Sequence, residues 1–181
     1  FIASEEISKH APKAKYQKKS TSLSQLKMAQ KLELNEKDHK SLISFAKKMK
    51  IDFISSPFDI KSIILLNKLK LKKIKIPSGE INNLPYLRKL GKLNKEIILS
   101  TGMSNLKEIQ YALKILVNSG TKKNKISLLH CNTEYPTPIN DINLNAMITI
   151  KNKFKLEIGY SDHSLLIETP IAAVTLGAKI I

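Results

Sequence analysis

Short apolar runs alternate along most of the chain with segments whose apolar residues recur at helical spacing. The runs have the length and β-branched content of strands, and the segments between them have the period of amphipathic helices. Alternating strands and helices predict a parallel sheet in an α/β protein. We expect strands at 51–56, 74–78, 96–101, 126–131, 156–161 and 178–181, and helices at 60–69, 84–90, 106–117, 144–154 and 167–176.

The N-terminal part is less regular. Residues 10–21 read HAPKAKYQKKST, and their polar composition predicts a loop. Residues 23–34 carry apolar residues at helical spacing, and Asn35 is the expected N-cap of a further helix that ends at about Lys48. The side chains expected to face inward from that helix are Leu42, Ile43 and Phe45.

The predicted strands end alike, in small polar residues. No glycine-rich dinucleotide loop follows any of them, so an open doubly wound sheet is less favoured than a closed (β/α)₈ barrel, which builds its site at the C-terminal ends of its strands. A barrel has eight strands, whereas the pattern gives six. We therefore expect one partial barrel domain over 1–181, about six of the eight βα units, with the first two strands absent. The similar strand ends are 55–57, 78–80, 100–102, 130–133 and 161–163.

The formal net charge of +16 raises the alternative of a nucleic-acid-binding domain. Arg88 is the only arginine, however, and nucleic-acid readers depend on the planar guanidinium and on stacking aromatics. The lysines are scattered along amphipathic helices, as at Lys107 and Lys114. We therefore expect a solvated basic surface that attracts small anions, without a nucleic-acid partner.

Cys131 is the only cysteine, which excludes an internal disulfide framework and favours a reducing compartment, most simply the cytoplasm. No apolar run is long enough to cross a membrane. The N-terminus lacks the basic-then-apolar layout of a signal peptide. We expect a cytoplasmic protein with no membrane partner.

Lys75 lies between two isoleucines in the run IKIPSGE, so on an alternating strand it faces away from them. Three interpretations stay open: an edge lysine whose amine reaches water, a clamp for an anion inside the barrel mouth, and a Schiff-base lysine. Beside it, Ser78 and Glu80 could bind a phosphate and a sugar hydroxyl.

His163 ends a strand beside Asp162, where a neutral imidazole can bind a divalent cation or serve as a structural residue. His130 ends another strand, and alternation points Cys131 away from it, so the two are not expected to share one ion. Two further histidines lie in polar contexts and are expected to be exposed: His10 and His39.

Hydroxyl groups recur at the strand ends. No histidine–acid pair is tied to a serine, so a serine nucleophile is unsupported. Singly these residues are turn residues; together they form a ring of donors for phosphate and carboxylate oxygens. The proline-containing turn at 133–138 either holds its side chains at the same rim or is a plain loop. The residues concerned are Ser56, Ser78, Ser100, Ser161, Thr133 and Tyr135.

Nine strings in one register give the chain a resemblance to the sialic acid synthase family, which includes N-acetylneuraminate and legionaminate synthases. They are HAPKAKYQ, SSPFD, KIPSGE, NLPYLRKL, ILSTGM, LLHCNTEYPTP, NLNAM, GYSDHS and AAVTLGAKII. The resemblance implies a (β/α)₈ barrel that condenses phosphoenolpyruvate with an open-chain N-acetylmannosamine-type sugar. C3 of phosphoenolpyruvate attacks the aldehyde, water adds at C2 and phosphate leaves, while Mn²⁺ or Mg²⁺ polarises the aldehyde oxygen.

The resemblance also implies roles for individual residues. Lys75 holds phosphoenolpyruvate, Glu80 and Tyr135 contact the sugar, and His163 is a metal ligand; His130 matches a family position but receives no role. Hydroxyl donors to phosphoenolpyruvate are Ser56, Ser78, Ser100, Thr133 and Ser161.

The chain departs from the family pattern in several places. Ser56 replaces the more usual threonine, and the order Asn132-Thr133 is reversed in some members. A second histidine ligand, a second phosphoenolpyruvate-binding lysine and a C-terminal antifreeze-like domain that reaches a partner subunit's site lie outside the chain. We expect a homodimer of the full-length protein, and an inactive, poorly stable piece if the chain stands alone. A Schiff-base aldolase that uses Lys75 remains an alternative.

Overall fold

The computed structural model describes residues 1–19 and 24–181. They form two compact units, Phe1–Leu71 and Lys72–Ile181, which are described separately. The expectation of one partial-barrel domain over the whole chain stays a prediction. Leu23, with which a helical segment was expected to begin, and the end of the expected loop at 10–21 lie outside the described residues.

The first unit is helical. A short 3₁₀ helix occupies part of the segment that was expected to be a loop. The strand expected at 51–56 is wrong, because only an isolated bridge at Ser55 occurs there. The elements are α1 (Ala3–Glu6), η1 (Lys15–Lys19), α2 (Gln25–Gln30), α3 (Glu36–Lys48) and α4 (Ile60–Lys68).

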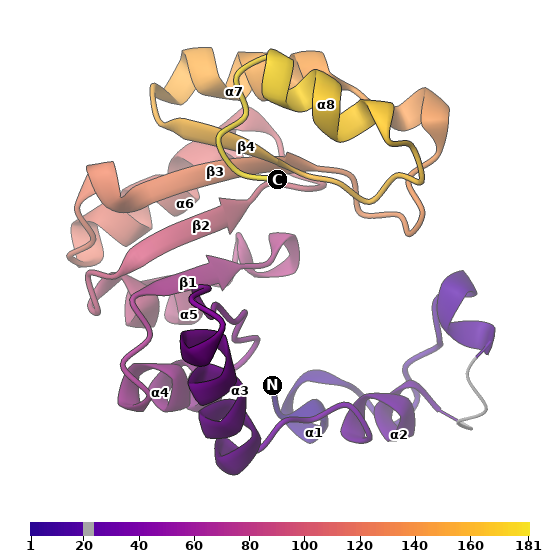
Figure 1. Cartoon of the computed structure of the whole chain (residues 1–181), viewed down its shortest axis with the longest axis vertical. Coiled ribbons are helices and arrows are strands. Elements are labelled where there is room, and N and C mark those ends of the chain that lie inside the picture. Colours follow the sequence, from indigo (N-terminus) through magenta and orange to yellow (C-terminus); the bar gives the residue numbers. More distant parts are fainter. Residues whose placement is uncertain (20–23) are drawn as a thin grey trace. The chain divides into compact units, whose positions relative to one another are not determined.

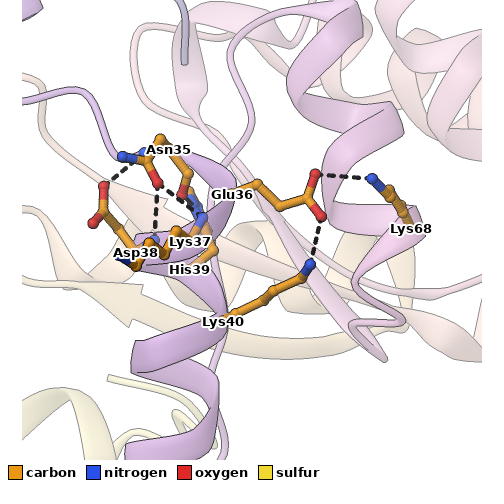
Figure 2. Close-up of polar contacts among 7 residues, drawn as sticks. All are labelled: Asn35, Glu36, Lys37, Asp38, His39, Lys40 and Lys68. Carbon is orange, nitrogen blue, oxygen red and sulfur yellow. Dashed lines mark hydrogen bonds and ion pairs between the residues drawn. The ribbon is translucent and has the colours of Figure 1, made fainter.

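Helix α3 begins as the sequence predicts, with a capping box. The Asn35 side chain accepts hydrogen bonds from the amides of Lys37 and Asp38, and the Asp38 side chain accepts one from the Asn35 amide (Figure 2). Glu36, in its first turn, pairs with Lys40 and with Lys68 of α4. The hydrogen bonds from Lys40 and then Lys68 lower the pKa of Glu36 to about 2.

The inward face of α3 differs from the expectation. Leu42 and Phe45 are 40% and 61% exposed, whereas Ala46 and His39 are each 6% exposed. His39 was expected to be exposed; its Nδ1 instead lies 2.9 Å from the Asn35 carbonyl, which satisfies the ring at the start of the helix. The buried face of α3 therefore contains Ala46 and His39, and the larger Leu42 and Phe45 lie outside it.

The second unit contains a four-stranded parallel sheet in the order β1-β2-β3-β4, and the four arrows point the same way in Figure 1. Four of the six expected strands are therefore confirmed. Strand order that follows chain order without reversal is barrel-like, because a doubly wound sheet reverses direction at a switch point. The strands are β1 (Lys73–Ile76), β2 (Glu96–Ser100), β3 (Ile126–Cys131) and β4 (Glu157–Ser161).

The helices that follow β1, β2 and β3 each begin at an asparagine cap, whereas the helix that follows β4 begins at Ile167 without a side-chain cap. Asn105 forms a capping box with Glu108 at the start of α6, and Gly120 ends that helix with φ 128°. None of the helices in the described residues is both long and apolar enough to span a bilayer. The remaining elements are η2 (Ser78–Glu80), α5 (Leu84–Gly91), α6 (Leu106–Ser119), η3 (Lys123–Lys125), η4 (Ile139–Asp141), α7 (Leu144–Phe154) and α8 (Glu168–Thr175).

The register gives the sheet two different faces. One row pairs Ile76 with Leu99, Leu99 with Leu128 and Leu128 with Ile158, and all four are 0–1% exposed. The alternate positions form the other face, which carries Lys75, Ser100, Cys131 and Ser161. We call this second set the polar face.

The last residues, 178–181, are not a strand by their backbone geometry, but they run beside β4 as a strand would. The Tyr160 amide donates to the Ile180 carbonyl at 2.9 Å, and the Lys179 amide donates to the Ile158 carbonyl at 2.8 Å. The segment passes so close to Gly159 that a Cβ there would collide with the Ile180 carbonyl oxygen and lie 2.6 Å from Leu129 Cδ2.

We expect Gly159→Ala to lower the free energy of unfolding of the whole protein by about 1–3 kcal/mol, because the added methyl group overpacks a backbone contact. Urea denaturation followed by circular dichroism measures this. Gly79→Ala is the matched control, since a Cβ at Gly79 meets nothing within 4 Å. Equal effects of the two substitutions would contradict the close approach at β4.

Candidate active site

Lys75 is half-buried on the polar face, between two isoleucines that are 0% exposed on the opposite face. This confirms the orientation that alternation predicts. Among residues 1–19 and 24–181, no acidic side chain forms an ion pair with its amine. A half-buried ammonium group without an acidic partner is suited to an anionic ligand.

Ser78 joins three successive strand ends. Its Oγ accepts a hydrogen bond from the Gly102 amide at 2.9 Å and lies 3.2 Å from Cys131 Sγ. A Cβ at Gly102 would lie 2.7 Å from Thr133 Cγ2, 2.9 Å from Ser78 Oγ and 3.0 Å from Cys131 Sγ. The loops after β1, β2 and β3 therefore meet at a glycine that has no room for a side chain.

His130 and Cys131 point to opposite faces, as expected. His130 lies opposite Tyr160 in the register, with ring centroids 5.7 Å apart, whereas Cys131 lies opposite Ser161 on the polar face. His130 also lines a cavity of about 990 Å³ between β3 and the first turns of α6 and α7. His130 thus belongs to the helix-covered side of the sheet.

His163 follows β4 and lies within reach of Lys75. Burial lowers its pKa below the ordinary value of 6.5; the Asn132 backbone and Asp162 oppose this shift, and the positive charge of Lys75 adds to it. Its Nε2 lies 3.3 Å from Ser161 Oγ. Its Nδ1 is buried and has no hydrogen-bond partner among the described residues.

The turn at 133–138 packs against His163. The Tyr135 ring stacks on the imidazole with centroids 4.1 Å apart and planes at 25°. The Thr137 amide donates to the His163 carbonyl at 2.9 Å, and Thr137 itself is 4% exposed. The turn is therefore anchored against His163, and its role in binding stays a prediction.

For three of the predicted residues, no hydrogen bond found in the described part of the chain connects them to His163 or Ser78. Glu80 accepts a hydrogen bond from the Asn83 side chain at 2.7 Å, beside the cap of α5. Ser100 is 1% exposed on the polar face, and its Oγ has no partner in the described part of the chain. Ser56 belongs to the other unit, where it lines a cavity of about 600 Å³.

His163 is suited to be one ligand of a divalent metal ion. A neutral imidazole with a buried, unpartnered ring nitrogen is the form in which histidine binds metals. Over residues 1–19 and 24–181 no group of three or more His, Cys, Asp or Glu side chains could hold an ion. The described residues thus contain one imidazole suited to a metal ion but no complete metal site, and the metal stays a prediction.

Gly102, Cys131 and Thr137 take part in the site but were not candidates from the sequence. Cys131 could have been found, because alternation places it on the same face as Lys75. No sequence pattern marks Gly102 or Thr137. Gly102 contributes its amide and the absence of a side chain, and Thr137 contributes an amide that donates to His163 in a different loop.

Burial lowers the pKa of His130 below 6.5, against the opposing effect of the Asn143 backbone. Well above pH 6.5, both the folded and unfolded states hold a neutral ring. As the pH falls through 6.5 the unfolded state takes up the proton first, so we expect the free energy of unfolding to fall. His130→Gln should flatten this slope in urea denaturation between about pH 7 and pH 5.

His10→Gln is the control for the pH profile, because His10 is exposed. It should leave the slope unchanged. A His130→Gln profile parallel to that of the unsubstituted protein would show that the ring is not buried as a neutral group.

Comparison with known proteins matches residues 1–181 to the NeuB family. The chain is 58% identical to N,N'-diacetyllegionaminic acid synthase of Campylobacter jejuni subsp. jejuni serotype O:2 over 183 residues, covering 100% of this chain and 55% of the relative. It is 40% identical over 185 residues to the enzyme of that name from Legionella pneumophila, covering 100% of this chain and 52% of the relative. The chain therefore spans about half the length of these relatives.

Solved structures agree. The N-acetylneuraminic acid synthetase of Leptospira borgpetersenii serovar Hardjo-bovis, in complex with citrate, superposes with a TM-score of 0.82 at 34% identity, covering 86% of this chain and 54% of that one. The phospho-2-dehydro-3-deoxyheptonate aldolase of Thermotoga maritima gives 0.70 at 25% identity, covering 81% and 45%. The sheet and its helices are part of a (β/α)₈ barrel, and the chain belongs to the NeuB family.

Proposed function

We propose that the protein to which this chain belongs condenses phosphoenolpyruvate with an N-acetylmannosamine-type amino sugar, giving a nonulosonic acid and phosphate. C3 of phosphoenolpyruvate forms a bond to the aldehyde carbon of the sugar. Water adds at C2, and the C–O bond to phosphate breaks. Membership of a family of sialic and legionaminic acid synthases supports this reaction class.

The observation that carries the proposal is the half-buried Lys75, which has no acidic partner among the described residues and lies near His163 at the ends of parallel strands. Phosphoenolpyruvate carries a carboxylate and a phosphate, and an ammonium group in a partly dry site attracts both. The related structure from Leptospira holds citrate, which like phosphoenolpyruvate is a small anion with more than one negative group.

Hydroxyl groups around Lys75 are suited to donate to the anion. Ser161 lies at the tip of β4, and Ser78 is already fixed by the Gly102 amide. Ser100 has a buried hydroxyl without a partner, which a ligand oxygen would satisfy. Thr133 approaches the same loops, and we assign Ser56 to the same set on the resemblance to the family.

The sugar is assigned to Glu80 and Tyr135. Tyr135 is 50% exposed beside His163, so part of its side chain can contact a ligand. Glu80 is held by Asn83 on the loop that follows β1, the strand of Lys75. A carboxylate and a phenol give acceptors and a donor for sugar hydroxyl and amide groups.

We propose Mn²⁺ or Mg²⁺ as the cofactor, with His163 as one ligand. The bound ion would act as a Lewis acid on the aldehyde oxygen of the sugar. We also propose a cytoplasmic homodimer. A Schiff-base aldolase is the runner-up, because the same amine could attack a carbonyl carbon.

Lys75→Ala should raise the KM for phosphoenolpyruvate about 10- to 100-fold, the cost of losing a charge-assisted hydrogen bond. The measurement is phosphate release by the whole protein, with Mn²⁺ and either N-acetylmannosamine or its 2,4-diacetamido-6-deoxy analogue. Lys72→Ala is the control, because Lys72 is exposed just before the same strand.

Unchanged kinetics of Lys75→Ala would remove Lys75 from the substrate site. Borohydride treatment in the presence of pyruvate distinguishes the Schiff-base aldolase from the synthase. A covalent adduct on Lys75, seen by mass spectrometry of the peptide, would favour the aldolase, whereas the synthase leaves the lysine unmodified.

EDTA should abolish activity, and added Mn²⁺ should restore it. His163→Ala should remove this response, because the ion loses a ligand, while His10→Ala, at an exposed histidine, should retain it. Activity that survives EDTA, or a normal Mn²⁺ response in His163→Ala, would contradict the metal assignment.

A further inference from the structure

We propose that Tyr135 is a positioning residue for His163: its ring, stacked on the imidazole, fixes the orientation in which that histidine binds a divalent ion. The inference rests on the proposed function, in which His163 is a metal ligand. It gives Tyr135 a task separate from any contact with the sugar.

The ring contact is close and nearly parallel. The Tyr135 and His163 centroids are 4.1 Å apart with planes at 25°, a stacked geometry. The neighbouring His130–Tyr160 pair, by contrast, is 5.7 Å apart and tilted by 42°. Rotation of the imidazole about its Cβ–Cγ bond would break the parallel contact, so the stack restrains that rotation.

The same turn also holds the backbone of the histidine. The Thr137 amide donates to the His163 carbonyl at 2.9 Å, and Thr137 is almost completely buried. The turn is itself tied by a hydrogen bond from the Glu134 amide to the Asn132 side chain at 2.7 Å. Side chain and main chain of His163 are therefore restrained by one segment that follows a different strand.

The two ring nitrogens of His163 have different surroundings. Nε2 faces Ser161 Oγ at 3.3 Å, whereas the buried Nδ1 has no partner in the described residues. A buried polar atom without a partner is costly unless a ligand completes it. The stack and the Ser161 contact together hold the imidazole in one orientation, beside the Asn132 backbone.

Activity alone cannot separate this role from sugar binding, because both would be lost with the ring. Metal binding without sugar can. The experiment is a titration of the whole protein with Mn²⁺ alone, followed by calorimetry and by the electron paramagnetic resonance signal of the free ion.

We expect Tyr135→Leu to weaken Mn²⁺ binding about 10-fold, the lower end of the effect of outer-shell residues on metal affinity. Tyr135→Phe keeps the ring and should bind as the unsubstituted protein does. Tyr111→Leu is the matched control, because Tyr111 is 51% exposed on α6 and Tyr135 is 50% exposed. Tyr135→Gln replaces the leucine variant if the latter has a lower melting temperature.

A second readout needs no metal. In the unsubstituted protein and in Tyr135→Phe, the stacked ring should shift the His163 imidazole proton resonances upfield, with assignment by His163→Gln. In Tyr135→Leu that shift should vanish.

Unchanged Mn²⁺ affinity and unchanged His163 resonances in Tyr135→Leu would overturn the inference. Equal weakening in Tyr135→Phe would overturn it as well, since the hydroxyl and not the stack would then be responsible. If the unsubstituted protein bound no Mn²⁺, the proposed metal cofactor would be wrong. The metal-positioning role of Tyr135 would then be wrong as well. The resonances would then still report whether the stack exists.

Discussion

The parallel register of four strands is the constraint on which the site depends. Because successive side chains alternate between the faces, one shift of register would move every polar residue into the helix-covered layer. The row of Ile76, Leu99, Leu128 and Ile158 prevents such a shift, since burying that row requires this phase. Hydrophobic burial on one face thus fixes the position of Lys75 and its neighbours on the other.

Beyond the strand tips, contacts between loops fix the geometry. Ser78 is held by an amide from the loop after β2, and the His163 carbonyl by an amide from the loop after β3. Among residues 1–19 and 24–181, two buried side-chain atoms have no hydrogen-bond partner, Ser100 Oγ and His163 Nδ1. A ligand that completes a buried polar atom gains more from binding than one that meets an atom already satisfied.

The sequence predicted the structure correctly where a single local rule determines it. The period-two pattern around Lys75 and the Asn35 cap of α3 both appear as predicted. It failed where the surroundings of a residue, and not its composition or spacing, determine the outcome. His39 is buried because the carbonyl of Asn35 satisfies its ring, and residues 51–56 have strand composition without forming a strand of the sheet. The stack of Tyr135 on His163 joins two loops, and no spacing within either loop predicts it.

Strand order along the sheet is the same as strand order along the chain. Each new strand therefore docks on the one synthesised just before it, with only a single helix and its connections between them. The entropy lost in closing each such loop is modest and comparable from one pair to the next. The sheet can accordingly assemble stepwise during translation, with each βα unit adding to an edge that is already in place.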